Sequence, residues 1–142
     1  MNMRPRRSVL YMPGANARAL EKSRNLPADS LIFDLEDAVA PDAKALARQQ
    51  ILDTLKTGGY GKRELIVRAN GLDTPWGVDD LNAIASSGAN AVLLPKIDTA
   101  KDVLAAVTLL EAGGAPDDLQ VWLMAETARG ILNIDSITQA HR

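Results

Sequence analysis

The sequence lacks cysteine altogether, and it has one histidine and few aromatic side chains, which make up 4% of its 142 residues. Without cysteine the chain can form neither a disulfide framework nor a thiolate metal site. The one histidine, His141, is the penultimate residue, and we assign it no role. Apolar residues nevertheless make up 46% of the chain, so aliphatic side chains must supply most of a core.

Strong charge of either sign is also missing. The 16 basic and 18 acidic residues give a net charge of −2, and no basic run stands out. This balance argues against a nucleic-acid binder and against a protein of membrane surfaces. No apolar stretch approaches the ~20 residues of a membrane span, and the one after the early arginines is too short for a signal peptide. We therefore expect a cytoplasmic protein, whose length suits one domain.

Five short apolar runs recur along the chain, with amphipathic stretches between them. The runs are rich in Val, Ile and Leu and alternate poorly, which is typical of strands buried on both faces. They cover residues 8–12, 29–35, 64–70, 90–96 and 120–126.

Helix signals fill the gaps between the runs. Asn16 is a suitable N-cap for a helix to about Leu26, and Thr99 forms a capping box with Asp102 in front of another. A further helix, after Pro41, is expected to place Leu46 on its apolar face. Alternating strands and helices predict an α/β fold with a parallel sheet covered by helices. A doubly wound open sheet and part of a (β/α)8 barrel, which typically takes ~250 residues, both remain open.

Polar side chains follow the apolar runs, where both architectures bind their ligands. Acids at this rim, without cysteine or a suitable histidine, point to a hard cation such as Mg²⁺ or Mn²⁺. An arginine beside them suggests an anionic substrate, because its planar fork binds a carboxylate through two bonds. The rim residues are Pro13, Gly14, Asp34, Glu36, Asp37, Arg68, Asn70, Pro95, Lys96, Glu126 and Thr127.

Each of these features also has a purely structural interpretation. Acids after a strand often cap the next helix or face solvent, Arg68 can pair with one of them, and Lys96 can be an exposed loop residue. The stretch after the first run, MPGANAR, lacks the G-x-G-x-x-G pattern of dinucleotide sites, and no Walker A lysine motif is present.

Five strings taken together are far more specific than any one residue. In this order they resemble the citrate lyase beta-subunit-like branch of the HpcH/HpaI aldolase family, which includes malyl-CoA and citramalyl-CoA lyases and malyl-CoA thioesterases. The strings are RSVLYMPGANARALEK, DLEDAVAPDAKALAR, VRANGLDTPWGVDDL, LPKIDTAKDV and ETARGILN.

The resemblance implies a TIM-type (β/α)8 barrel, of which this chain covers about the first five β/α units. It implies an enzyme that uses Mg²⁺, with Glu126 as metal ligand at the substrate. Arg68 would hold the carboxylate of the substrate or keto acid. Glu36 and Asp37 match an acidic pair that borders the metal and its waters, so Arg68, Glu36 and Asp37 form the expected catalytic group.

The resemblance also implies contacts with coenzyme A through Tyr11 and Lys22. Many family members carry arginine at the position of Asn16, whereas this chain has Arg18 two residues later, as members of the citrate lyase type do. The second metal ligand and a catalytic acid from a neighbouring subunit would lie beyond residue 142. Residues 1–142 are thus expected to form the N-terminal part of a single barrel domain in a protein about twice as long.

We therefore expect a Mg²⁺-dependent carbon–carbon lyase, or a related thioesterase, acting on a 3-hydroxyacyl-CoA. Malyl-CoA, citramalyl-CoA and citryl-CoA, thioesters of hydroxy-dicarboxylic acids, are the candidates, and a lyase would give a keto acid and an acyl-CoA. A homo-oligomer, trimeric or hexameric, is expected. Two alternatives remain: an aldolase on free keto acids without CoA, and a non-catalytic half-barrel that serves binding or assembly.

Overall fold

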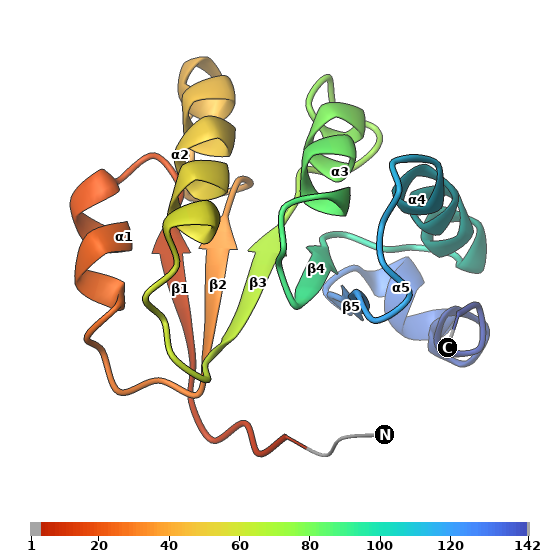
Figure 1. Ribbon diagram of the computed structural model, residues 1–142. Coiled ribbons are helices and arrows are strands. Elements are labelled where there is room, and N and C mark those ends of the chain that lie inside the picture. The colour runs from red at the N-terminus through yellow and green to blue at the C-terminus, as the bar shows by residue number, and fades with distance from the viewer. Residues whose placement is uncertain (1–3, 142) are drawn as a thin grey trace.

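The computed structural model describes residues 4–141 as one parallel sheet with helices between its strands (Figure 1). The strands are β1 (Val9–Pro13), β2 (Ser30–Asp34), β3 (Glu64–Arg68), β4 (Ala91–Leu94) and β5 (Gln120–Leu123). The helices are α1 (Ala17–Ser23), the 3-10 helix η1 (Pro41–Ala43), α2 (Lys44–Thr57), α3 (Gly77–Ala85), α4 (Ala100–Ala112), α5 (Ala128–Leu132) and α6 (Ile134–Thr138). Four strands lie within their apolar runs and β1 extends one residue past its run, to Pro13, so the five expected strands are confirmed.

Strand order separates the two architectures that the sequence left open. The order is β1-β2-β3-β4-β5, with every neighbouring pair parallel. A doubly wound sheet reverses its strand order at a switch point, whereas a barrel adds strands in chain order. Figure 1 shows α1 to α4 following one another around the outside of the sheet. The chain therefore has the arrangement of five consecutive β/α barrel units.

Two apolar clusters lie on the two faces of the sheet. The larger joins sheet and helices, and includes Leu31 and Phe33 of β2. The smaller contains Ile32 and Ile66, with Trp122 packed against it. Because successive side chains of a strand point to opposite faces, the residues at 34 and 68 share the second face with Ile32 and Ile66. The ends of β2 and β3 thus project polar groups from the face that the helices do not cover.

The predicted helix caps are present, but one helix end and one buried helix face differ from the prediction. The Asn16 side chain accepts the Ala19 N–H, and Thr99 and Asp102 form their reciprocal box. Helix α1 ends at Ser23, earlier than the predicted Leu26, and the chain continues through turns. Leu46 was expected on the buried face of its helix but is 57% exposed. The apolar stripe of α2 is narrow, and residues such as Ala47 and Ile51 fill it.

No helix within the described range is both long and apolar enough to cross a bilayer.

Candidate functional site

The centre of the candidate site is a buried ion pair between Arg68 and Asp34, the last residues of β3 and β2. These two residues are register partners in the parallel ladder. The Arg68 Nε and Nη2 atoms each donate to one oxygen of Asp34, both at 2.7 Å. Asp34 is 1% exposed and Arg68 is 8% exposed. Such a two-bond fork fixes the plane of the guanidinium as well as its position.

Backbone groups hold Asp34 from its other side. Its Oδ1 accepts the Glu36 N–H at 2.9 Å and its Oδ2 accepts the Ala38 N–H at 3.0 Å. Burial favours the neutral acid, but the hydrogen bonds from Arg68 and the backbone outweigh it and lower the pKa of Asp34 below its ordinary value. Gly14 permits this packing, because a Cβ there would lie 2.6 Å from the Asp34 carbonyl oxygen. The carboxylate therefore stays charged in place.

The remaining edge of Arg68 faces three other side chains. Nη1 lies 3.0 Å from Oε2 of Glu36, yet this buried oxygen receives no aligned hydrogen bond from any residue that the structure describes. The Tyr11 ring stacks over the guanidinium at 4.9 Å, and Nη1 donates to the Met124 sulfur at 3.6 Å. Burial opposes the charged form of Arg68, but the Asp34 hydrogen bonds and charge raise its pKa above the ordinary value. Arg68 is thus a permanent, oriented cation.

Two buried donors fix the loop that carries the acidic pair. The Lys44 ammonium, at the start of α2, donates to the carbonyls of Leu35 at 2.7 Å and Glu36 at 2.6 Å. It also lies 5.3 Å from the centre of the Trp76 ring. The Asn70 side chain donates to the Leu35 carbonyl at 2.9 Å. Burial lowers the pKa of Lys44 below its ordinary value.

Behind this loop lies Asp80, which is fully buried in α3. Its Oδ2 accepts the Asn70 backbone N–H at 2.9 Å and the Asn70 side chain at 2.6 Å. Its Oδ1 accepts Nε of Arg48 at 2.7 Å. Sequence reasoning missed Lys44, Arg48 and Asp80, because it searched the strand ends and these residues lie on helices. The available signal was an acid directly before Leu81, at a helix position where an apolar residue is expected.

The other half of the rim is organised around Lys96. Its ammonium makes ion pairs with Glu36 and, at 3.4 Å, with Asp37. Its backbone N–H donates to Oε1 of Glu126 at 2.8 Å. The hydrogen bond to Glu36 and the nearby acids raise the pKa of Lys96 above its ordinary value. Arg68 and Lys96 therefore form ion pairs with the rim acids and offset the repulsion among them.

The side chains described for residues 4–141 include no cluster of three acids or histidines that could enclose a metal ion. Mg²⁺ does not require one, because it usually keeps several waters and takes one or two carboxylates. Glu126 is exposed, and only its Oε1 takes part in a hydrogen bond within the described range. It therefore fits as a single Mg²⁺ ligand.

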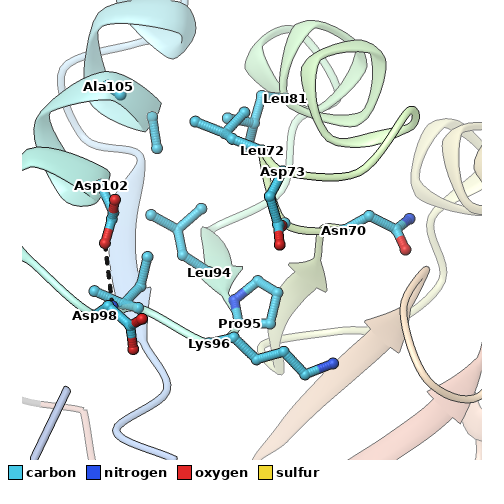
Figure 2. A pocket seen from close by; sticks show the side chains of 13 residues that line it. Asn70, Leu72, Asp73, Leu81, Leu94, Pro95, Lys96, Asp98, Asp102 and Ala105 are labelled. Carbon is cyan, nitrogen blue, oxygen red and sulfur yellow. Dashed lines mark hydrogen bonds between the residues drawn. The ribbon is translucent and has the colours of Figure 1, made fainter. Parts of the chain in front are cut away.

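A cavity of about 290 Å³ lies next to this rim, between α3 and α4 beyond the ends of β3 and β4 (Figure 2). Leu72, Leu81 and Leu94 give it an apolar wall. Asp102 also lines it, but its carboxylate is used to cap α4. Figure 2 shows the side chains of Asn70 and Lys96 extending to the same side. Because Asn70 and Lys96 also line the cavity, it adjoins the charged group.

The residues expected to contact coenzyme A do not form one group. Tyr11 stacks on Arg68, inside the charged cluster. Arg18 and Lys22 are exposed, four residues apart on α1. No ion pair or hydrogen bond within the described range links them to the rim.

Comparisons with known proteins show which sequences and folds this chain resembles. The (3S)-malyl-CoA thioesterase of Cereibacter sphaeroides (strain ATCC 17025) is 51% identical over 133 residues, which are 94% of this chain and 45% of that protein. The L-malyl-CoA/beta-methylmalyl-CoA lyase of the same organism is 38% identical over 144 residues, with 96% and 45% covered. The Mycobacterium tuberculosis citrate lyase beta subunit, solved with oxaloacetate and magnesium, superposes with a TM-score of 0.77 at 30% identity, covering 99% of this chain and 56% of that one.

The chain thus spans less than half the length of these two curated relatives. The sequence model of one family, described as HpcH/HpaI aldolase/citrate lyase, matches residues 7–142. This match and the 51% identity confirm the resemblance that the five strings suggested. The chain belongs to the HpcH/HpaI aldolase/citrate lyase family.

Proposed function

We propose that this chain provides the substrate-anion half of a Mg²⁺-dependent enzyme acting on a 3-hydroxyacyl-CoA, such as malyl-CoA, citramalyl-CoA or citryl-CoA. The observation that carries the proposal is the way Arg68 is held. The names of the relatives supply the substrate class, since two of them act on malyl-CoA esters.

Arg68 is arranged to bind a second carboxylate besides Asp34. A guanidinium has five N–H groups. Asp34 accepts from Nε and from one side of Nη2. At the terminal edge formed by Nη1 and Nη2, Nη1 donates only to the weakly accepting Met124 sulfur within the described residues. The acid nearest that edge, Glu36, makes no aligned hydrogen bond to it. A substrate carboxylate at this edge would meet a cation that is already oriented, so little ordering is lost on binding.

Glu126 is the proposed Mg²⁺ ligand, with Glu36 and Asp37 acting through water. A bound Mg²⁺ would supply a Lewis acid at the oxygen of the substrate carbon next to the carboxylate. The chain's own contribution is to orient the parts: Arg68 holds the carboxylate and the Lys96 N–H holds Glu126. Tyr11, Arg18 and Lys22 remain the proposed contacts of coenzyme A.

Two reactions are compatible with this arrangement. In a lyase, loss of the hydroxyl proton drives C–C cleavage to a keto acid and the enolate of an acyl-CoA. In a thioesterase, water attacks the thioester carbonyl and frees the CoA thiol. The relatives include both activities by name, so the reaction itself must be measured.

The test is an assay of the intact protein with Mg²⁺ and each of the three CoA esters, followed by product analysis. Release of the free CoA thiol indicates a thioesterase, and a keto acid with an acyl-CoA indicates a lyase. Arg68→Ala should lower kcat/KM. The expected fall corresponds to a loss of about 2–5 kcal/mol in the stabilisation of the transition state. Arg7→Ala is the matched control, because it removes the same charge from an exposed pair with Asp29 near the opposite end of β1.

Three results would contradict the proposal. Wild-type kcat/KM in Arg68→Ala would remove Arg68 from the site. Turnover of free keto acids, with no binding of CoA esters, would identify an aldolase without CoA. Binding to a full-length relative without any turnover would favour a non-catalytic assembly protein.

A further inference from the structure

Lys96 has an unusual backbone conformation directly after β4. Its φ is +50°, and it is the one residue other than glycine with positive φ in the part of the chain that the structure describes. A lysine pays a steric cost in this left-handed region that glycine would avoid. Strained residues of this kind gather at functional sites, where other contacts determine the conformation. The contacts that hold Lys96 therefore indicate what its side chain is for.

Those contacts tie together the two halves of the rim. The backbone N–H of Lys96 donates to Glu126, and the ammonium reaches Glu36 and Asp37, which follow β2. The side chain of Lys96 is 56% exposed, whereas that of Glu36 is 8% exposed. An exposed cation thus holds a buried acid from the solvent side.

Glu36 lies between two cations and, among residues 4–141, is hydrogen-bonded through its side chain to only one. Its Oε1 pairs with Lys96. Its Oε2 lies 3.0 Å from Nη1 of Arg68 but accepts no aligned hydrogen bond there. A buried carboxylate free to turn would complete that bond, because an unsatisfied buried oxygen is costly. The pull of Lys96 on Oε1 accounts for the incomplete contact.

We propose that Lys96 is a positioning residue that keeps the contact of Glu36 with Arg68 an unaligned ion pair, so that Nη1 of Arg68 can donate its hydrogen bond to the substrate carboxylate. Without the ammonium, Glu36 turns to complete an aligned hydrogen bond with Arg68 and competes with the substrate for that donor. The proposal rests on the proposed function in one respect, namely that Arg68 binds the substrate anion.

The test uses the intact protein with Mg²⁺ and pyruvate, a stable 2-oxo acid that carries the carboxylate in question. Calorimetry should show pyruvate affinity at least about tenfold weaker in Lys96→Met than in the unchanged protein. Lys96→Gly should show the same loss, because glycine keeps the left-handed backbone and removes the side chain that carries the ammonium. Lys101→Met is the control, since it removes one positive charge from an exposed position on α4.

The decisive variant combines Lys96→Met with Glu36→Gln. A neutral amide no longer competes for Arg68, so pyruvate affinity should return to within about threefold of Glu36→Gln alone. Failure to recover would mean that Lys96 touches the anion directly, and it would overturn the proposal. So would unchanged affinity in Lys96→Met, or a loss of equal size in Lys101→Met.

A crystal structure of Lys96→Met gives a readout that does not depend on any ligand. We expect Oε2 of Glu36 to accept an aligned hydrogen bond from Arg68 in that variant. A Glu36 side chain that keeps its present position would overturn the proposal. Pyruvate binding that is unaffected by Arg68→Ala, in contrast, would count against the proposed function, while the crystal structure would still decide where Glu36 lies.

Discussion

The two ends of the sheet hold their polar residues in opposite ways. At the β2–β3 end, every residue of β2 is buried, and Arg68 and Asp34 are enclosed by hydrogen bonds on several sides. At the β4–β5 end, no residue of β5 is fully buried, and Glu126 is exposed with one hydrogen bond from Lys96. The proposed anion-binding half is therefore organised before any ligand arrives, whereas the proposed metal-binding half depends on one strained residue.

The difference should appear directly in energetics. A buried ion pair that loses one partner leaves an uncompensated charge in a poorly solvated place. An exposed pair that loses one partner leaves a charge that water can solvate, so the cost is small. Substitutions at the β2–β3 end should therefore affect stability and activity together. Substitutions at the β4–β5 end should affect ligand binding with little change in stability.

The largest effect is expected for Asp34→Ala. It leaves the guanidinium of Arg68 buried without its carboxylate, and it removes the acceptor for the backbone N–H groups of Glu36 and Ala38. The free energy of unfolding should fall by about 3–5 kcal/mol. Denaturant titration of the intact protein measures this, with the exposed Asp37→Ala as control. Equal, small losses in both variants would erase the contrast between the two ends.

Lys44→Met should have the next largest effect. Methionine keeps the length and packing of the side chain, but the carbonyls of Leu35 and Glu36 lose their shared donor. We expect a loss of about 1–3 kcal/mol in stability, together with lower kcat/KM, because the loop that carries Glu36 loosens. Lys56→Met, at the exposed last turn of the same helix, is the control. If Lys44→Met is destabilised but keeps a normal kcat/KM, the hydrogen bonds of Lys44 to the loop serve folding alone.

Acid should weaken the β2–β3 end by a smaller and pH-dependent amount. The folded-state pKa of Asp34 lies below its unfolded value of about 3.9. Its contribution is therefore fully present above that value, and it is lost as the pH falls through the folded pKa. Stability measured from pH 6 to pH 2 should fall less steeply in Asp34→Asn than in the unchanged protein. Parallel curves would mean that Asp34 is not a source of the acid sensitivity.

Local signals in the sequence were enough for most of the fold. Strand positions and the Thr99–Asp102 capping box depend on residues close in the chain, and both were predicted correctly. Leu46 was misplaced because a broad apolar face does not say which side the sheet will cover. The barrel was predicted only from the resemblance to the family. Five β/α units in a sequence do not distinguish a barrel from an open sheet until the strand order is known.

The site was predictable in part, for a similar reason. The rule that strand ends converge correctly brought Arg68 together with Asp34 and Glu36. That rule could not predict that Asp34, and not another acid, makes the two-bond contact with Arg68, because this contact depends on strand register. The contribution of Asp80 depends on side chains from α2 and from the loop after β3, which only the folded chain brings together. The roles of Tyr11, Arg18 and Lys22 with coenzyme A stay predictions.

The smallest effect on stability is expected for Glu126→Gln, which is also the sharpest test of the exposed end. The amide keeps the shape of the side chain, and its oxygen can still accept the Lys96 N–H, so the free energy of unfolding should change by no more than about 0.5 kcal/mol. The lost charge should nevertheless weaken Mg²⁺ binding, because hard cations prefer charged oxygen ligands. Calorimetric titration with Mg²⁺ measures this beside thermal unfolding without metal. Unchanged Mg²⁺ affinity would remove Glu126 from the metal site. A large loss of stability would show instead that the exposed end is as tightly built as the buried one.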